Sequence, residues 1–133
     1  MGIGNLKILF VDDSSIVRDM IESFLLELGY LNAESAVDGV DALEKINQTD
    51  EAFDFIITDI NMPNMDGITF IKKLRERFDY ISTPIMVLST EWTDEMKQQG
   101  KNAGATSWIV KPFDLQLIKK GIEATLEKVN EEL

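Results

Sequence analysis

Five short apolar runs alternate with five longer stretches in which apolar residues recur every three or four positions. The short runs predict strands at residues 7–11, 32–37, 53–58, 85–88 and 108–110. The longer stretches predict helices. Apolar positions at helical spacing are Ile16, Val17, Met20, Ile21, Phe24 and Leu25 in the first helix, Ala42, Leu43 and Ile46 in the second, and Ile68, Ile71, Leu74 and Phe78 in the third. The fourth helix is polar and weakly amphipathic, and the last has a predicted buried stripe of Leu115, Ile118, Ile122, Leu126 and Val129.

Residues that favour helix ends flank these stretches. Ser14 or Ser15 can cap the first helix, Thr93 the fourth and Asp114 the last, because their side-chain oxygens accept bonds from free backbone N–H groups. Gly29 and Gly104 follow the first and fourth helices, where glycine commonly ends a helix.

Strict alternation of strands and helices predicts an α/β fold. Such a chain forms right-handed βαβ units, which give a parallel sheet with helices on both faces. A length of 133 residues suits one domain, residues 1–133, with a core of about 6–130. The last predicted helix occupies the rest of the chain, so we expect no separate output domain. We expect the ends, 1–5 and 130–133, to be irregular.

Composition and charge narrow the possible functions. The net charge of −11 disfavours binding to nucleic acid or to an anionic membrane surface. The chain has no cysteine and no histidine, which excludes thiol nucleophiles, disulfides, zinc sites built on these residues and imidazole catalysis. It carries no membrane-spanning stretch and no signal-peptide pattern. We therefore expect a cytoplasmic protein whose partners offer basic surfaces.

Polar residues follow four of the five predicted strands. Asp12 and Asp13 follow the first strand, Asp59 the third, Ser89 the fourth and Lys111 the fifth. Parallel strands end at one edge of their sheet, and that edge is where open α/β sheets bind ligands. For each position a simpler interpretation exists: a helix cap or turn for the aspartates, a strand end for Ser89, and a surface lysine for Lys111. Their convergence on one edge favours a site.

Three carboxylates at one edge predict a divalent cation. Their mutual repulsion would raise their pKa values, and Mg²⁺ relieves it because it prefers oxygen ligands. We expect Asp13 and Asp59 to ligate Mg²⁺ directly, Asp12 to act through water, and the main-chain carbonyl of Asn61 to contribute.

The same residues fit phosphoryl transfer. Asp59 can act as a nucleophile that forms an acyl phosphate. Lys111 and Ser89 would stabilise the oxygens of the transferred group.

The combination Asp12-Asp13, Asp59 within TDINMPNMDG, Ser89 after MVL, and Lys111-Pro112-Phe113 resembles the receiver domain of two-component response regulators. The resemblance covers essentially the whole chain and is greatest to the stand-alone chemotaxis regulators. It implies a flavodoxin-like doubly wound sheet of order 2-1-3-4-5 and a cis peptide between Lys111 and Pro112. It also implies a sensor histidine kinase (CheA-like) as phosphodonor, a downstream target such as a flagellar switch protein, and a possible phosphatase.

In this family the hydroxyl residue, here Ser89, is coupled to an aromatic residue in the last strand, here Trp108. The ring turns inward on activation and changes the face formed by the fourth helix, the fifth strand and the fifth helix. Ser89 replaces the commoner Thr, and Trp108 replaces the commoner Tyr or Phe, so a larger ring must turn. Trp108 has simple core packing as its alternative role. The resemblance also places Asn61 and Glu91 beside the path of the attacking water, which implies self-dephosphorylation within seconds to minutes.

The predicted function is therefore a monomeric signalling switch rather than an enzyme acting on another substrate. The favoured role is that of a chemotaxis or motility regulator, and the alternative is a phosphorelay intermediate. A Mg²⁺-dependent phosphatase is disfavoured because Asn61 stands where such enzymes carry an acid. A module that works without phosphorylation is disfavoured because no acidic or lysine residue of the motif is missing, and a nucleotide-binding fold because no glycine loop follows the first strand. The role of Trp92 stays open.

Overall fold

The computed structural model describes the backbone of residues 5–132 and the side chains of residues 5–129. The predicted irregular residues 1–4 and 133 lie outside this range, whereas residues 130–132, also predicted to be irregular, belong to the last helix. The elements run in the order β1 (Lys7–Val11), α1 (Ser15–Glu27), β2 (Asn32–Ala36), α2 (Gly39–Gln48), β3 (Phe55–Thr58), α3 (Gly67–Arg75), the 3₁₀ turn η2 (Phe78–Tyr80), β4 (Ile85–Ser89), α4 (Asp94–Ala103), β5 (Ser107–Val110) and α5 (Leu115–Glu132).

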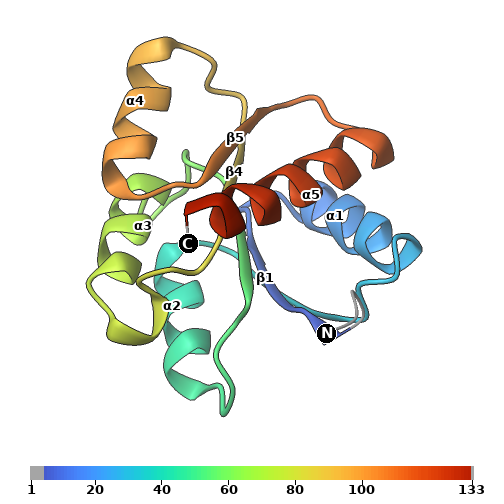
Figure 1. Cartoon of the computed structure of the whole chain (residues 1–133), viewed down its shortest axis with the longest axis horizontal. Coiled ribbons are helices and arrows are strands. Elements are labelled where there is room, and N and C mark those ends of the chain that lie inside the picture. Colours follow the sequence, from blue (N-terminus) through green and yellow to red (C-terminus); the bar gives the residue numbers. More distant parts are fainter. Residues whose placement is uncertain (1–4, 133) are drawn as a thin grey trace.

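The five strands form one parallel sheet in the order β2-β1-β3-β4-β5, which confirms the predicted fold class and strand order. In Figure 1 the sheet lies in the middle, with α1 and α5 on one face and α2, α3 and α4 on the other. All four residues of β3 are buried, as expected for the central strand of a covered sheet.

Each face of the sheet has its own core. Ile8 and Phe10 of β1 pack with Ile21 and Leu25 of α1 and with Ile118 and Ile122 of α5. Leu9 and Val11 point to the other face and join the apolar residues of α2 and α3. This alternation along β1 follows from the two-residue period of a strand. Burying one such side chain is worth about 1.5–3 kcal/mol, so the two cores supply most of the stability of the fold.

The helix caps that the sequence predicted are present in the structure. Ser14, Thr93 and Asp114 cap α1, α4 and α5 as predicted, whereas Ser15 is the first residue of α1. Asp38 and Asp66 cap α2 and α3 in the same way. Gly29 and Gly104 have φ values of +93° and +119°, the left-handed conformation that favours glycine after a helix.

Several sequence predictions were wrong in detail. Phe78 does not extend α3 but is 94% exposed in the turn that follows it. The helical spacing of Ile16 and Met20 correctly predicted α1, although both side chains are exposed. Phe53 is buried but precedes the strand, because its N–H donates to the hydroxyl of Tyr80 rather than to a neighbouring strand.

The last helix buries a polar residue that the apolar pattern did not indicate. Ile118 and Ile122 are buried as predicted, and the rest of the stripe is partly buried. Thr125 is fully buried as well, and its hydroxyl donates to the carbonyl of Gly121 and pairs with the hydroxyl of Ser107 in β5. This pair satisfies both hydroxyl groups and fixes α5 to the edge strand.

Candidate functional site

The register of the sheet brings the predicted polar residues to one edge. Val11 pairs with Thr58, so Asp12 and Asp59 leave neighbouring strands at the same level. Ser89 pairs with Val110, the residue before Lys111. The prediction that the strand ends converge is therefore confirmed.

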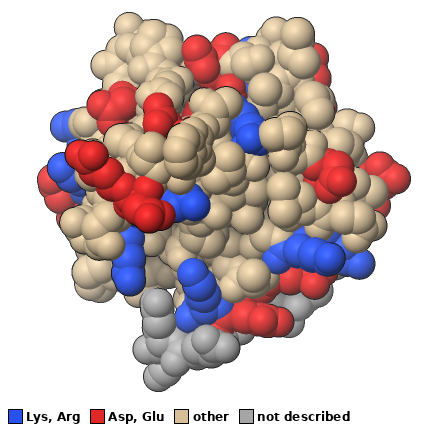
Figure 2. Space-filling model, turned by 90° about the horizontal axis from the view of Figure 1, so that it is seen from above, with Lys and Arg blue, Asp and Glu red and all other residues tan. Residues whose placement is uncertain are grey.

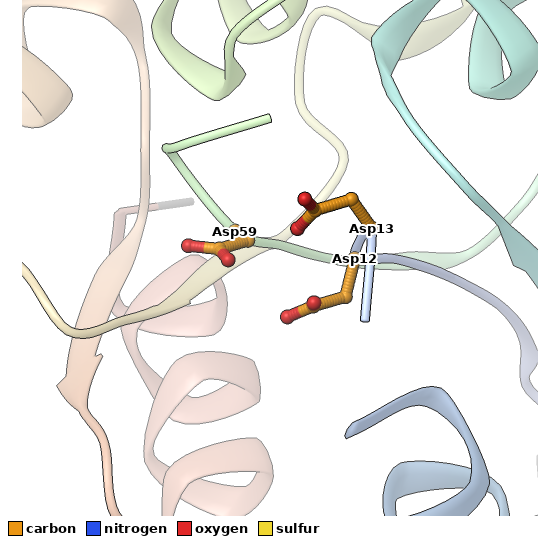
Figure 3. A group of neighbouring side chains, drawn as sticks. All are labelled: Asp12, Asp13 and Asp59. Carbon is orange, nitrogen blue, oxygen red and sulfur yellow. The ribbon is translucent and has the colours of Figure 1, made fainter. Parts of the chain in front are cut away.

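Three carboxylates meet at this edge. Asp12 and Asp13 come from the end of β1 and Asp59 from the end of β3, and Figure 3 shows the three side chains next to one another. One carboxylate oxygen from each residue lies within 4.8 Å of the others. Asp12 is 1% exposed and Asp59 7% exposed, whereas Asp13 is open to solvent. The group is thus largely buried with one exposed side.

Asp59 is held rigidly by its neighbours. Its backbone N–H donates to the carbonyl of Val11 at 2.9 Å. The backbone N–H of Ile60 donates to its Oδ1 at 2.7 Å, and Nζ of Lys111 lies 3.1 Å from its Oδ2. These contacts orient both carboxylate oxygens.

Asp12 is fixed in a similar way. Its Oδ1 accepts from the backbone N–H of Ser14 at 2.9 Å, and its Oδ2 accepts from Nζ of Lys111 at 2.8 Å. Burial raises the pKa of Asp12, and the negative charge of Asp59 adds to that rise; the Lys111 and Ser14 bonds oppose it but do not cancel it. The predicted repulsion is therefore present at Asp12.

Lys111 is the cation shared by both buried aspartates. Burial alone would lower its pKa, but the bonds and charges of Asp12 and Asp59 outweigh burial and raise it. Its backbone N–H donates to the carbonyl of Ser89, and the Lys111–Pro112 peptide is cis, as the family resemblance implied.

The donor set fits Mg²⁺. The group has three carboxylates, and Lys111 contacts only two of them, so the group keeps excess negative charge; all its ligand atoms are oxygens. Within the residues described, no other group of three or more acidic side chains has this geometry.

Ser89 ends β4 and is fully buried. Its Oγ accepts from the backbone N–H of Glu91 at 3.2 Å. A hydroxyl that accepts still has its own proton to donate. Ser89 can therefore bind an anionic group without losing this contact.

Asn61 and Glu91 lie together on the rim. The side-chain amide of Asn61 donates to Oε1 of Glu91 at 2.9 Å. The structure thus joins two residues that are 30 positions apart in the sequence.

Trp108 is partly buried against the core on the side of α2, α3 and α4. Its Nε1–H donates to the main-chain carbonyl of Glu91 at 2.9 Å. This position agrees with core packing, which the sequence indicated as the alternative role of Trp108. Trp92, whose role stayed open, is 69% exposed.

Two features near the site were missed in the sequence. A Cβ at Gly67 would lie 2.1 Å from the carbonyl oxygen of Asp59, so only glycine lets α3 begin this close to the site. The second feature joins Asp38, at the start of α2, to Asn64 in the loop after Asp59 through a 2.7 Å bond. The Asp66-Gly67 pair signals a helix start in the sequence, but nothing local signals the Asp38–Asn64 contact.

The surface shows no single dominant patch on the face drawn in Figure 2, where acidic and basic side chains are interspersed. Across residues 5–132, the structure contains no helix with the length and apolar character needed to cross a membrane.

Comparison with known proteins agrees with this site. The family model of the response regulator receiver domain matches residues 8–123. The chemotaxis protein CheY of Pseudomonas aeruginosa is 37% identical over 127 residues, which cover 94% of this chain and 99% of that protein. CheY-3 of Vibrio cholerae is 35% identical over 125 residues, 94% of this chain and 95% of its own length. The solved structure of the chemotaxis response regulator CheY4 of Vibrio cholerae has a TM-score of 0.84 and 43% identity, and covers 90% of this chain and 98% of its own. The chain therefore belongs to the response regulator receiver domain family.

Proposed function

We propose that residues 1–133 act as one receiver domain, a signalling switch that accepts a phosphoryl group on Asp59 from a sensor histidine kinase. The observation that carries this proposal is the arrangement of Asp59 itself. Its carboxylate is nearly buried at a strand end, shares Lys111 with Asp12, and lies within 4.8 Å of two further carboxylates.

The transfer step uses the fixed carboxylate as the nucleophile. One oxygen of Asp59 forms a bond to phosphorus while the N–P bond of the donor phosphohistidine breaks. The electron pair of that bond stays on the imidazole nitrogen, which takes up a proton. Lys111 and the free hydroxyl proton of Ser89 then bind the oxygens of the phosphoryl group.

Asp12, Asp13, Asp59 and the main-chain carbonyl of Asn61 would hold Mg²⁺ in this site. Bound there, Mg²⁺ would screen the negative charge of both the carboxylates and the incoming phosphoryl group. The exposed side of Asp13 leaves a path for the ion and for the donor.

Output requires a partner, and one groove has suitable chemistry. A groove of about 1010 Å³ lies between α4, β5 and α5 and has Trp108 in its lining. Lys97, Lys101, Lys128 and Arg75 contribute to it, and no acidic residue is among the described residues that line it. In a chain of net charge −11, this local excess of cations favours a partner that presents carboxylates.

We propose a chemotaxis role, with the chain acting in the cytoplasm as a monomer on a flagellar switch protein and receiving phosphate from a CheA-like kinase. The identity to chemotaxis proteins and the Asn61–Glu91 pair support it. A separate phosphatase is a possible further partner. A phosphorelay intermediate is the second candidate, and slow loss of the phosphoryl group would favour it.

The central test is chemical phosphorylation followed by intact mass measurement. The protein is incubated with acetyl phosphate with and without Mg²⁺, next to Asp59→Asn and, as a matched control, the exposed Asp94→Asn. We expect one phosphoryl adduct in the parent and in Asp94→Asn, and none in Asp59→Asn or without Mg²⁺. An adduct that survives in Asp59→Asn would contradict the assignment of the nucleophile.

The lifetime of the adduct separates the two candidate roles. Loss within seconds to minutes supports the diffusible switch, whereas persistence for hours supports the relay. Binding to the flagellar switch protein of the same genome, compared with and without beryllofluoride, would then test the chemotaxis role. Charge reversal at Lys97 and Lys101 should weaken that binding if the basic groove is the contact surface.

A further inference from the structure

We propose that the indole of Trp108 is a fixed latch that positions Glu91 and thereby sets how long a phosphoryl group survives on Asp59. This inference rests on the proposed function, since it concerns the same acceptor. It differs from the ring rotation that the family resemblance implied. The indole stays in place, and its work is to hold the loop that carries Glu91.

The first end of the latch is a hydrogen bond. Nε1–H of Trp108 donates to the main-chain carbonyl of Glu91 at 2.9 Å. Glu91 lies in residues 90–93, the connection between β4 and α4, where no strand or helix ladder fixes the backbone. A phenyl ring at position 108 has no donor for this carbonyl.

The second end is a close packing contact with α4. A Cβ at Gly100 would lie 2.5 Å from Cζ3 and 2.9 Å from Cε3 of Trp108, too close for any other residue to fit unless the ring moved. Glycine is unfavourable inside a helix, yet Gly100 occupies the second turn of α4 and is buried there. Gly100 therefore makes the space that the six-membered ring fills. With one edge of the indole against Gly100 and the other bonded to Glu91, the ring cannot turn without losing both contacts.

The latch continues to the site through Glu91. The backbone N–H of Glu91 donates to Oγ of Ser89 at 3.2 Å, and its Oε1 accepts from Asn61 at 2.9 Å. Trp108, Ser89 and Asn61 thus hold Glu91 at its carbonyl, its N–H and its carboxylate. Asn61 is two residues after Asp59, and Glu91 is two residues after Ser89, so the held pair lies at the same edge of the sheet as the acceptor.

The reaction affected is hydrolysis of the acyl phosphate. The oxygen of a water molecule forms a bond to phosphorus, and the bond between phosphorus and the Asp59 oxygen breaks. The electron pair returns to the carboxylate, and a water proton leaves with inorganic phosphate or solvent. After pairing with one another, Glu91 still has an acceptor and Asn61 still has a donor for that water. An ordered pair orients the water better than a loose one.

The test measures decay of the phosphoryl adduct in Trp108→Phe and Gly100→Ala. The first variant removes the N–H donor, and the second leaves the indole intact but pushes it aside. We expect both to lengthen the half-life by roughly fivefold, the effect of losing one net hydrogen bond. Trp92→Phe, at an exposed position, is the control and should decay like the parent. Thermal melts identify any variant that is not folded.

A coupling experiment distinguishes the proposed latch from a merely structural role of Trp108. In an Asn61→Ala background, Trp108→Phe should cause no further change in half-life, because the latch acts through the Asn61–Glu91 pair. Equal additional slowing in that background would overturn the proposal.

Fluorescence tests whether the ring is fixed. The chain has two tryptophans, so Trp92→Phe leaves Trp108 as the only indole. With Mg²⁺ and beryllofluoride, we expect no shift of its emission maximum and no change in acrylamide quenching. A shift of the emission maximum in either direction, with a matching change in quenching, would mean that the ring rotates and would overturn the latch.

The outcomes also distinguish the two proposals. If all variants take up phosphate but decay at the parent rate, the latch is wrong and the switch stands. If the parent takes up no phosphate on Asp59, both are wrong.

Discussion

Asp38→Ala should destabilise the protein more than any other loss of a helix cap. Asp38 is nearly buried, and each of its carboxylate oxygens has a partner. Oδ1 accepts from the N–H of Asp41 in the first turn of α2 at 2.8 Å, and Oδ2 accepts from the side-chain amide of Asn64 at 2.7 Å. One carboxylate thus caps a helix and also ties that helix to the loop after Asp59.

The magnitude follows from these two contacts. Loss of an N-cap costs about 1 kcal/mol, and loss of a hydrogen bond to a charged group about 2 kcal/mol. We therefore expect the free energy of unfolding to fall by about 3 kcal/mol. For 133 residues the unfolding entropy is about 0.28 kcal/mol/K, so Tm should fall by about 10 °C.

Asp66→Ala is the matched control. Asp66 caps α3 through the same bond, to the N–H of Thr69 at 2.8 Å, but it is exposed and has no second element to hold. Its loss should cost only about 1 kcal/mol. Asn64→Gly removes the amide at a residue with φ of +67°, which glycine tolerates, and should leave the cap intact. A double-mutant cycle of Asp38→Ala with Asn64→Gly, measured by urea unfolding, gives the energy of the tie between loop and helix.

The dependence on pH provides a further check. The N–H of Asp41 and the amide of Asn64 lower the pKa of Asp38. The stabilisation is therefore fully present above the unfolded value of about 3.9 and is lost as the pH falls through the lower folded value. The gap between the parent and Asp38→Ala should be constant near neutral pH and close only below about pH 4. Equal losses in Asp38→Ala and Asp66→Ala, or a gap that closes near neutral pH, would refute the reasoning.

Three further predictions concern the site and the surface. Lys111→Ala should lower the free energy of unfolding by about 3 kcal/mol in chelator, measured by urea titration, because it leaves two buried carboxylates without a cation; an unchanged midpoint would count against the buried pair. Mg²⁺ at about 100 times its Kd should raise stability by about 2.7 kcal/mol in the parent and much less in Asp13→Asn at the same concentration, as read by thermal melts; equal gains in both would exclude Asp13 as a ligand. Phe78→Ser should change stability by less than about 0.5 kcal/mol in the same melts, since the ring is 94% exposed, and a larger loss would mean that it packs against another part of the chain.

The sequence by itself determined the α/β architecture and the edge of the sheet at which the candidate site residues lie. The short runs at residues 7–11 and 85–88 are typical of covered strands, and their alternation with helical stretches favours parallel connections. Parallel strands share an edge, so Asp12, Asp59 and Lys111 had to meet there. For that reason the convergence at one edge could be predicted without coordinates, whereas the strand order was implied only by the family resemblance.

Only the tertiary structure decided which side chains touch across separate elements. The Asp38–Asn64 bond joins two loops, the Gly100–Trp108 contact joins a helix to an edge strand, and neither leaves a local pattern in the sequence. At Phe78 the sequence did carry a local pattern, but the tertiary structure overrode it. Its spacing continued the apolar stripe of α3, but the helix ends at Arg75, whose guanidinium donates to the carbonyls of Tyr80 and Gly104. Spacing along one helix fixes the face on which a side chain lies, whereas the neighbouring elements determine where that helix ends and what its side chains contact.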